Sequence, residues 1–99
     1  MEVCTEFAVF KVSENNIQRA IALSRAIFSE MNQEKVVITD FQILQKTDTP
    51  HELCWHLTWL NSQVAKDTTQ KWPSFPSTQE FQSLVEKDLY YGHFVNALS

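Results

Sequence analysis

The chain has 99 residues, 43% of them hydrophobic and 12% aromatic, which is enough apolar material for a core without disulfides. Its net charge of -4 and eight scattered Lys and Arg argue against nucleic acid or an anionic membrane as a partner, because both attract clustered positive charge. Cys4 and Cys54 show neither metal-ligand nor disulfide-framework spacing, and no signal or membrane-spanning segment is evident. We therefore expect one cytoplasmic domain over residues 1–99, without metal or cofactor.

The first half of the chain predicts a strand, a helix and a second strand. Residues 6–12 are rich in β-branched and aromatic side chains and end at a polar cluster, which is typical of a strand that closes on a turn. From Asn16 to Met31 the apolar side chains recur with helical spacing. Alternation returns over 36–46, and the polar, proline-containing turn 47–52 predicts that a hairpin follows.

The third predicted strand, residues 53–60, is the most apolar part of the chain. With a period of two, one face carries Leu53, Trp55, Leu57 and Trp59. The other face carries Cys54, His56, Thr58 and Leu60. Neither set suits exposure to bulk water, so we expect a covering layer on each face of this strand. A chain this short cannot easily supply both layers, so the strand also indicates assembly with another chain.

The last part of the chain predicts a broken helix and a final strand. Residues 61–71 have a helical pattern that stops at the prolines of 73–76, since proline inside a helix removes a hydrogen bond and clashes with the preceding turn. A second helical piece, about 77–87, opens with a Ser-Thr-Gln-Glu capping box. Residues 89–95 read as a strand that contains the chain's one glycine.

The resulting order is β-α-β-β-α-β, which predicts an α+β, ferredoxin-like fold. In this arrangement a four-stranded antiparallel sheet carries both helices on one face and leaves the other face open. The strands offer apolar side chains to both faces, as Phe7 and Val9 do against Ala8 and Phe10. An open apolar sheet face is an association site, so we expect a symmetric homodimer in which two sheets pack together.

Two short segments carry a family resemblance. Residues 57–65 (LTWLNSQVA) form a strand that ends in Trp before a helix begins, and residues 75–81 (FPSTQEF) follow in the broken second helix. In these features the chain resembles the dimeric α+β barrel proteins related to antibiotic-biosynthesis monooxygenases. The resemblance implies a homodimer whose sheets form a shared barrel, with a pocket in each subunit between sheet and helices. Family members include cofactor-free oxygenases of aromatic polyketides and haem-degrading enzymes.

This chain lacks several residues that members of that family use, which narrows the activities that the resemblance implies. Where haem-degrading relatives have an Asn on the first strand and a Trp/His pair in the second-helix region, this chain has Glu6, Thr68 and Thr78. Haem degradation is therefore not expected. A histidine often present in the broken helix of other relatives is also missing, because residues 61–88 contain none.

Two histidines and one tyrosine are the candidates for proton transfer: His56 in the third strand, and His93 and Tyr91 in the last. Imidazole titrates near neutral pH and could move a proton to or from a bound phenol or enol. The favoured alternative is that both histidines are satisfied in the core or at an interface. Tyr90 and Tyr91 point to opposite faces of their strand, so at most one of them reaches a pocket.

Aromatic side chains are the candidates for ligand binding, because small-molecule sites are walled by apolar groups with few polar ones. These candidates are Trp55, Trp59, Trp72, Phe75 and Phe81. Core packing is the favoured alternative for Trp55, whereas Trp72, at the helix break, fits a pocket rim equally well. We interpret Glu6 and Asp40 as solvated or interfacial charges, in preference to a pair of carboxylates for acid/base catalysis, because the sequence does not give the distance between them.

Three functions stay open at this point. In the first, the chain binds a small apolar or aromatic molecule. In the second, it is a cofactor-independent oxygenase that acts on an electron-rich aromatic, in which His93 or Tyr91 transfers the proton and a tryptophan positions the substrate. The third alternative is a dimeric scaffold without pocket chemistry.

Overall fold

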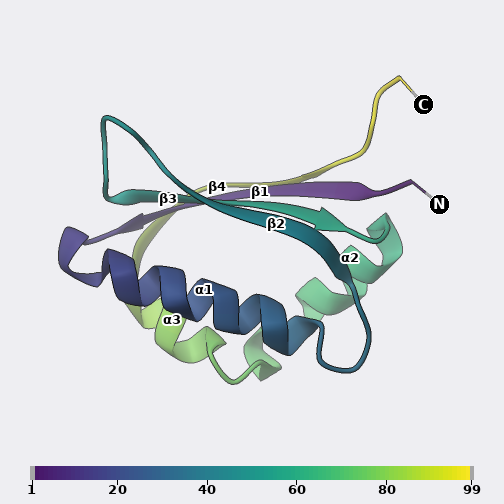
Figure 1. Cartoon of the computed structure of the whole chain (residues 1–99), viewed down its shortest axis with the longest axis horizontal. Coiled ribbons are helices and arrows are strands. Elements are labelled where there is room, and N and C mark those ends of the chain that lie inside the picture. The colour runs from purple at the N-terminus through teal and green to yellow at the C-terminus, as the bar shows by residue number, and fades with distance from the viewer. Residues whose placement is uncertain (1, 99) are drawn as a thin grey trace.

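A computed structural model describes residues 2–98 and contains a four-stranded sheet with helices on one side of it (Figure 1). In chain order the elements are β1 (Cys4–Val12), η1 (Glu14–Asn16), α1 (Ile17–Met31), β2 (Ile38–Gln45), β3 (Glu52–Trp59), α2 (Ser62–Gln70), η2 (Trp72–Ser74), α3 (Thr78–Leu84) and β4 (Val85–Phe94). Here η1 and η2 are single turns of 3-10 helix. None of the helices within 2–98 is both long and apolar enough to cross a membrane.

The sheet has the strand order β2-β3-β1-β4, and every neighbouring pair is antiparallel. The helices all lie beneath the sheet in Figure 1, so no helix of the described part of the chain covers the upper face. This arrangement confirms the ferredoxin-like α+β fold that the order of elements predicts.

The two faces of β3 are divided as its period of two predicts. The side chains that face the helices are almost fully buried, with exposed fractions of 0–3%: Leu53, Trp55, Leu57 and Trp59. Those on the other face, which include Cys54 and His56, are only half-buried. Burial of a large apolar side chain contributes about 1.5–3 kcal/mol, so β3 is a principal anchor of the helices.

The core between the sheet and the helices contains a cluster of aromatic rings around Trp55. The ring of Trp55 has centroids of Phe28 at 4.8 Å and of Phe10 at 4.9 Å, both edge-on, and that of Phe81 at 5.0 Å. The indole N–H of Trp55 donates to the hydroxyl of Ser24 at 2.9 Å, which satisfies the one polar atom of this buried side chain.

Two expectations at the last helix are wrong. The helix ends at Leu84 and not near residue 87, because Val85 already pairs with Val12 as the first residue of β4. The capping box does not form either. The Ser77 backbone N–H and hydroxyl donate to the carboxylate of Glu30 on α1, at 3.0 and 2.5 Å, while Glu80 binds Arg19 through two bonds of 2.7 Å. Partners on α1 thus replace the local pair.

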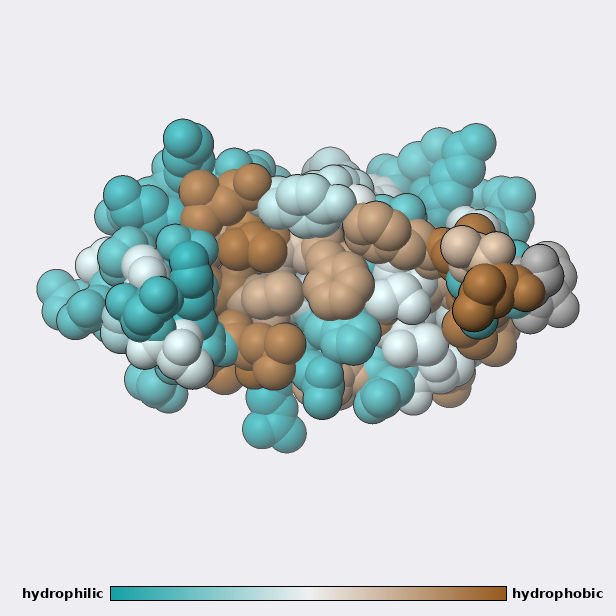
Figure 2. Space-filling view, turned by 90° about the horizontal axis from the view of Figure 1, so that it is seen from above, coloured by the Kyte–Doolittle hydropathy of each residue, from teal (hydrophilic) through white to brown (hydrophobic). Residues whose placement is uncertain are grey.

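We call the uncovered face of the sheet the open face. It carries a row of aromatic side chains with one valine beside them: Phe7, His56, Tyr90, Phe94 and Val9. Phe7 stacks on His56 with ring centroids 4.6 Å apart and meets Phe94 edge-on at 5.8 Å. Figure 2 shows hydrophobic side chains gathered across the middle of this side of the molecule. Tyr90 and Phe94 remain about half exposed.

Candidate functional site

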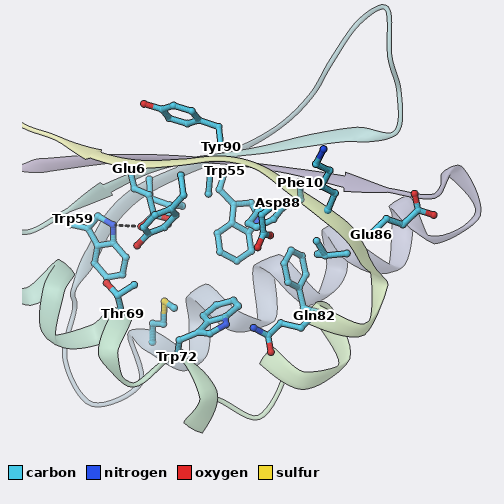
Figure 3. Close-up of a pocket in the computed structure, with 17 residues that line it drawn as sticks. Glu6, Phe10, Trp55, Trp59, Thr69, Trp72, Gln82, Glu86, Asp88 and Tyr90 are labelled. Atoms are coloured by element: carbon cyan, nitrogen blue, oxygen red, sulfur yellow. Dashed lines mark hydrogen bonds between the residues drawn. The ribbon is translucent and has the colours of Figure 1, made fainter.

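A pocket of about 660 Å³ lies between the helix side of the sheet and the helices (Figure 3). Its walls come from β1, β3 and β4 on one side and from α1, α2, η2 and α3 on the other. This volume lies within the range of pockets that hold a drug-sized molecule.

One wall of the pocket is aromatic. All three tryptophans of the chain line it, together with Phe81 and Phe10. Trp72 meets Trp55 edge-on with centroids 5.8 Å apart and lies opposite the sheet in Figure 3. Phe75 does not contribute to the lining and packs against the core from outside.

The other end of the pocket is polar and centres on Glu6. This residue is 3% exposed, and its Oε1 accepts a hydrogen bond from the indole N–H of Trp59 at 3.1 Å. Nε2 of His93 lies 2.9 Å from the same oxygen, and the hydroxyl of Tyr91 lies 2.9 Å from Nε2. We call these four residues, Glu6, Trp59, His93 and Tyr91, the Glu6 cluster. The interpretation of Glu6 as a solvated or interfacial charge is wrong.

Strand register explains why these residues meet. Across β1 and β4, Glu6 pairs with His93 and Ala8 pairs with Tyr91. Paired residues point to the same face, so Glu6, His93 and Tyr91 share the helix side of the sheet. On the other flank of β1, Cys4 pairs with Trp59, which brings the indole over the Glu6 carboxylate. Antiparallel pairing thus converges side chains from three strands on one point.

The structure separates the candidates for proton transfer. His93 and Tyr91 belong to the Glu6 cluster, whereas His56 lies on the open face, where Nδ1 is 3.0 Å from the amide oxygen of Gln42. Tyr90 also lies on the open face, stacked beside Phe94. The sheet therefore stands between His56 and the pocket.

Burial decides the electrostatics of the Glu6 cluster. Loss of solvent raises the pKa of Glu6 above its ordinary value of 4.5, and the neighbouring charge of His93 with the hydrogen bonds from His93 and Trp59 opposes that rise. Partial burial also raises the pKa of Tyr91, and the negative charge of Glu6 adds to this effect. Both shifts favour the protonated form: the phenol stays protonated at neutral pH, and the Glu6 carboxyl keeps its proton to higher pH than a free glutamate does.

The rim of the pocket is acidic on balance. Asp88 and Glu86 line it from the first part of β4 with Lys87 beside them, and the Lys11 ammonium lies 4.0 Å from Glu86. With Glu6 inside, carboxylates outnumber the one cationic lining residue, so the pocket is a poor host for an anion. Within residues 2–98, no group of three or more His, Cys, Asp and Glu is arranged to hold a metal ion.

Glu6 is the pocket residue for which the prediction from the sequence is wrong. A signal for its burial was present: Glu6 shares the period-two face of β1 with Cys4, Ala8 and Val12, which are all buried. The rim residues Gln82, Glu86 and Asp88 had no comparable signal, because the elements that they meet across the pocket, such as β1 and η2, are far from them in the sequence.

Comparisons with known proteins agree on the fold. No family model and no curated protein matches the chain. Among solved structures, SnoaB, a cofactor-independent oxygenase from Streptomyces nogalater, aligns with 14% identity and a TM-score of 0.72, over 95% of this chain and 92% of that one. A Chloroflexus aurantiacus protein, provisionally described as an antibiotic biosynthesis monooxygenase, aligns with 14% identity and a TM-score of 0.73, over 96% and 93%.

MupZ from Pseudomonas fluorescens aligns with 9% identity and a TM-score of 0.77, over 99% of this chain and 75% of that one. Identities this low establish the fold alone. The chain thus has the α+β fold of proteins like the antibiotic biosynthesis monooxygenases, as the sequence resemblance implies.

The raised pKa of Glu6 predicts how stability depends on pH. Between pH 4.5 and the higher pKa that Glu6 has in the folded protein, the folded state binds more protons than the unfolded state. The stabilising contribution of this carboxyl group is therefore complete below pH 4.5 and is lost as the pH rises through the folded pKa. We expect the free energy of unfolding of the wild type to fall relative to Glu6→Gln over that interval. Urea unfolding of both proteins from pH 4 to 8 measures the difference. A difference that is constant with pH, or that grows in favour of the wild type, would contradict the assignment.

Proposed function

We propose that this chain binds a small, neutral, apolar or aromatic molecule in the pocket between sheet and helices. The observation that carries the proposal is a 660 Å³ pocket with an aromatic wall and one buried polar end. This combination is what small-molecule sites have in common: apolar area supplies affinity and a few placed polar groups fix orientation. The acidic rim favours a ligand without negative charge. The free cysteines Cys4 and Cys54 fit the reducing cytoplasm as its location.

A matched pair of variants tests binding. Trp72 lines the pocket and Phe75, three residues on, does not, although both pack against the core. We expect Trp72→Ala to weaken naphthalene binding about tenfold, because a ligand loses one aromatic contact surface, and Phe75→Ala to leave affinity unchanged.

The indole N–H signals of the three tryptophans in a ¹H–¹⁵N NMR titration provide the readout, since all three side chains line the pocket. Absence of any indole shift up to saturating naphthalene, in a folded wild type, would overturn the proposed pocket. Equal loss of affinity in the two variants would show that the effect is general destabilisation.

We further propose that the chain is a homodimer through the open face. Its support is the row of partly exposed aromatic side chains, which includes Phe7, Tyr90 and Phe94, on the face of the sheet that no helix within residues 2–98 covers. A second copy offers the same surface and is related by a two-fold axis, as in most homodimers. Stable interfaces of this kind bury about 800 Å² per partner, which a small sheet can supply.

Substitution within the open face tests the dimer. Phe7→Asp places a charge at the centre of the aromatic row, so we expect a monomer in analytical ultracentrifugation where the wild type is a dimer. Val36→Asp is the control, because Val36 is also exposed but lies in the loop before β2. A monomeric wild type at tens of micromolar, or dissociation by both substitutions, would count against the open face as the interface.

A second candidate function is a cofactor-independent oxygenase, which the Glu6 cluster favours. Such a reaction turns a CH₂ group activated by a neighbouring carbonyl into C=O: O₂ is the oxidant, one oxygen atom enters the product and the other leaves as water with the two hydrogens. The protein's part is to accept the first proton, and Glu6 with His93 is placed for this role.

Oxygen uptake with anthrone measures this activity. We expect turnover that Glu6→Gln lowers by at least about 10²-fold, as for removal of a general base, and that His56→Ala leaves unchanged because His56 faces away from the pocket. Uptake that does not exceed the uncatalysed rate would remove the candidate and leave the binding function standing.

A further inference from the structure

The two oxygens of the Glu6 carboxylate have different surroundings. Both hydrogen bonds that reach this side chain from the described residues, from Trp59 and from His93, end on Oε1. Within residues 2–98 no donor is bonded to Oε2, although Glu6 is 3% exposed and lines the pocket. Among the described residues, Oγ1 of Thr78 is the one buried side-chain oxygen or nitrogen without a partner, so Oε2 of Glu6 is not sealed in the protein and borders the pocket. A hydrogen-bond donor for Oε2 therefore comes from the contents of the pocket.

We infer that Oε2 of Glu6 accepts a hydrogen bond from a hydroxyl group of the ligand, so that the pocket selects neutral hydroxyaromatic molecules, phenols or enols, over their ethers and carboxylates. This inference rests on the proposed binding function and adds the chemical class of the ligand. His93 is a positioning residue in this assignment: its Nε2 holds Oε1, so that Oε2 remains directed at the ligand.

The geometry of the polar end distinguishes a hydroxyl from other donors. A ligand carboxylate would place a second negative charge beside Glu6, with Asp88 and Glu86 already at the rim. An ammonium group brings three donors, each of which needs an acceptor once the group is buried, whereas a hydroxyl brings one. A single hydroxyl satisfies Oε2 and leaves the rest of the ligand to the aromatic wall formed by Trp55, Trp59 and Trp72.

The test compares 2-naphthol with 2-methoxynaphthalene, which share a ring system but differ in their donor. In the wild type we expect 2-naphthol to bind at least about tenfold more tightly, since a hydrogen bond to a charged acceptor accounts for a factor of this order. Glu6→Gln turns the Oε2 position into an amide donor while Oε1 keeps its two bonds, so the preference should shrink to within about twofold. Glu86→Gln removes a rim carboxylate and should keep the preference.

Variants of His93 test the positioning role by the affinity ratio of the two compounds, a quantity that general destabilisation does not change. We expect His93→Leu to reduce the preference for 2-naphthol and His93→Gln, which retains an N–H donor, to restore most of it. Dissociation constants come from calorimetric titration, and far-UV circular dichroism verifies that each variant is folded.

The outcomes separate the inference from the function on which it rests. If neither naphthalene derivative binds the folded wild type, the proposed binding function fails and the inference fails with it. If both bind with equal affinity, or if Glu6→Gln leaves the preference intact, the pocket function stands and the role of Glu6 is overturned.

Discussion

Two buried tryptophans on β3 each have an indole N–H that needs an acceptor, and the two acceptors set the polarity of the helix side of the sheet. An indole N–H buried without a partner costs about 1–3 kcal/mol, so each must find an acceptor. Trp55 finds the hydroxyl of Ser24 on α1, and this end of the sheet closes into packed aromatic core. Trp59 finds the carboxylate of Glu6, a group that requires further donors, and His93 supplies one. One strand therefore supplies part of the aromatic wall of the pocket, at Trp55, and part of its polar end, at Trp59.

That space exists because the second crossover is broken. The prolines at 73 and 76 prevent one continuous helix, so α2 and α3, of nine and seven residues, cover the sheet in two short pieces joined by η2. Trp72 sits in η2 and turns its ring toward Trp55 and Phe81 without filling the region near Glu6. A single long helix would pack evenly against the strands, whereas the break leaves a concavity at the polar end. The proposed ligand site thus depends on two prolines that never touch it.

The sequence predicts the fold well and the site only in part, for physical reasons that particular residues make clear. Alternation in 53–60 reports burial directly, because strand geometry has a period of two, and the structure agrees. Glu6 obeys the same alternation, yet its charge argued for solvent, and only the distant partners His93 and Trp59 explain how a carboxylate is accommodated there. The unformed capping box has the same origin, since a contact with Glu30 replaces a favourable local pattern.

The alternation of β1 also joins the pocket to the open face. Glu6 points to the pocket, while the next residue, Phe7, pairs with Gly92 and stacks on His56 on the other side. A side chain at Gly92 would come within 3.1–3.3 Å of the Tyr90 hydroxyl and the Phe94 ring, so glycine lets these aromatic groups lie close together over the sheet. The pairing of β1 with β4 that aligns this row is the one that brings His93 to Glu6. A partner sheet packed on the open face, as proposed, would hold that register and so keep the polar end of the pocket assembled without contacting it.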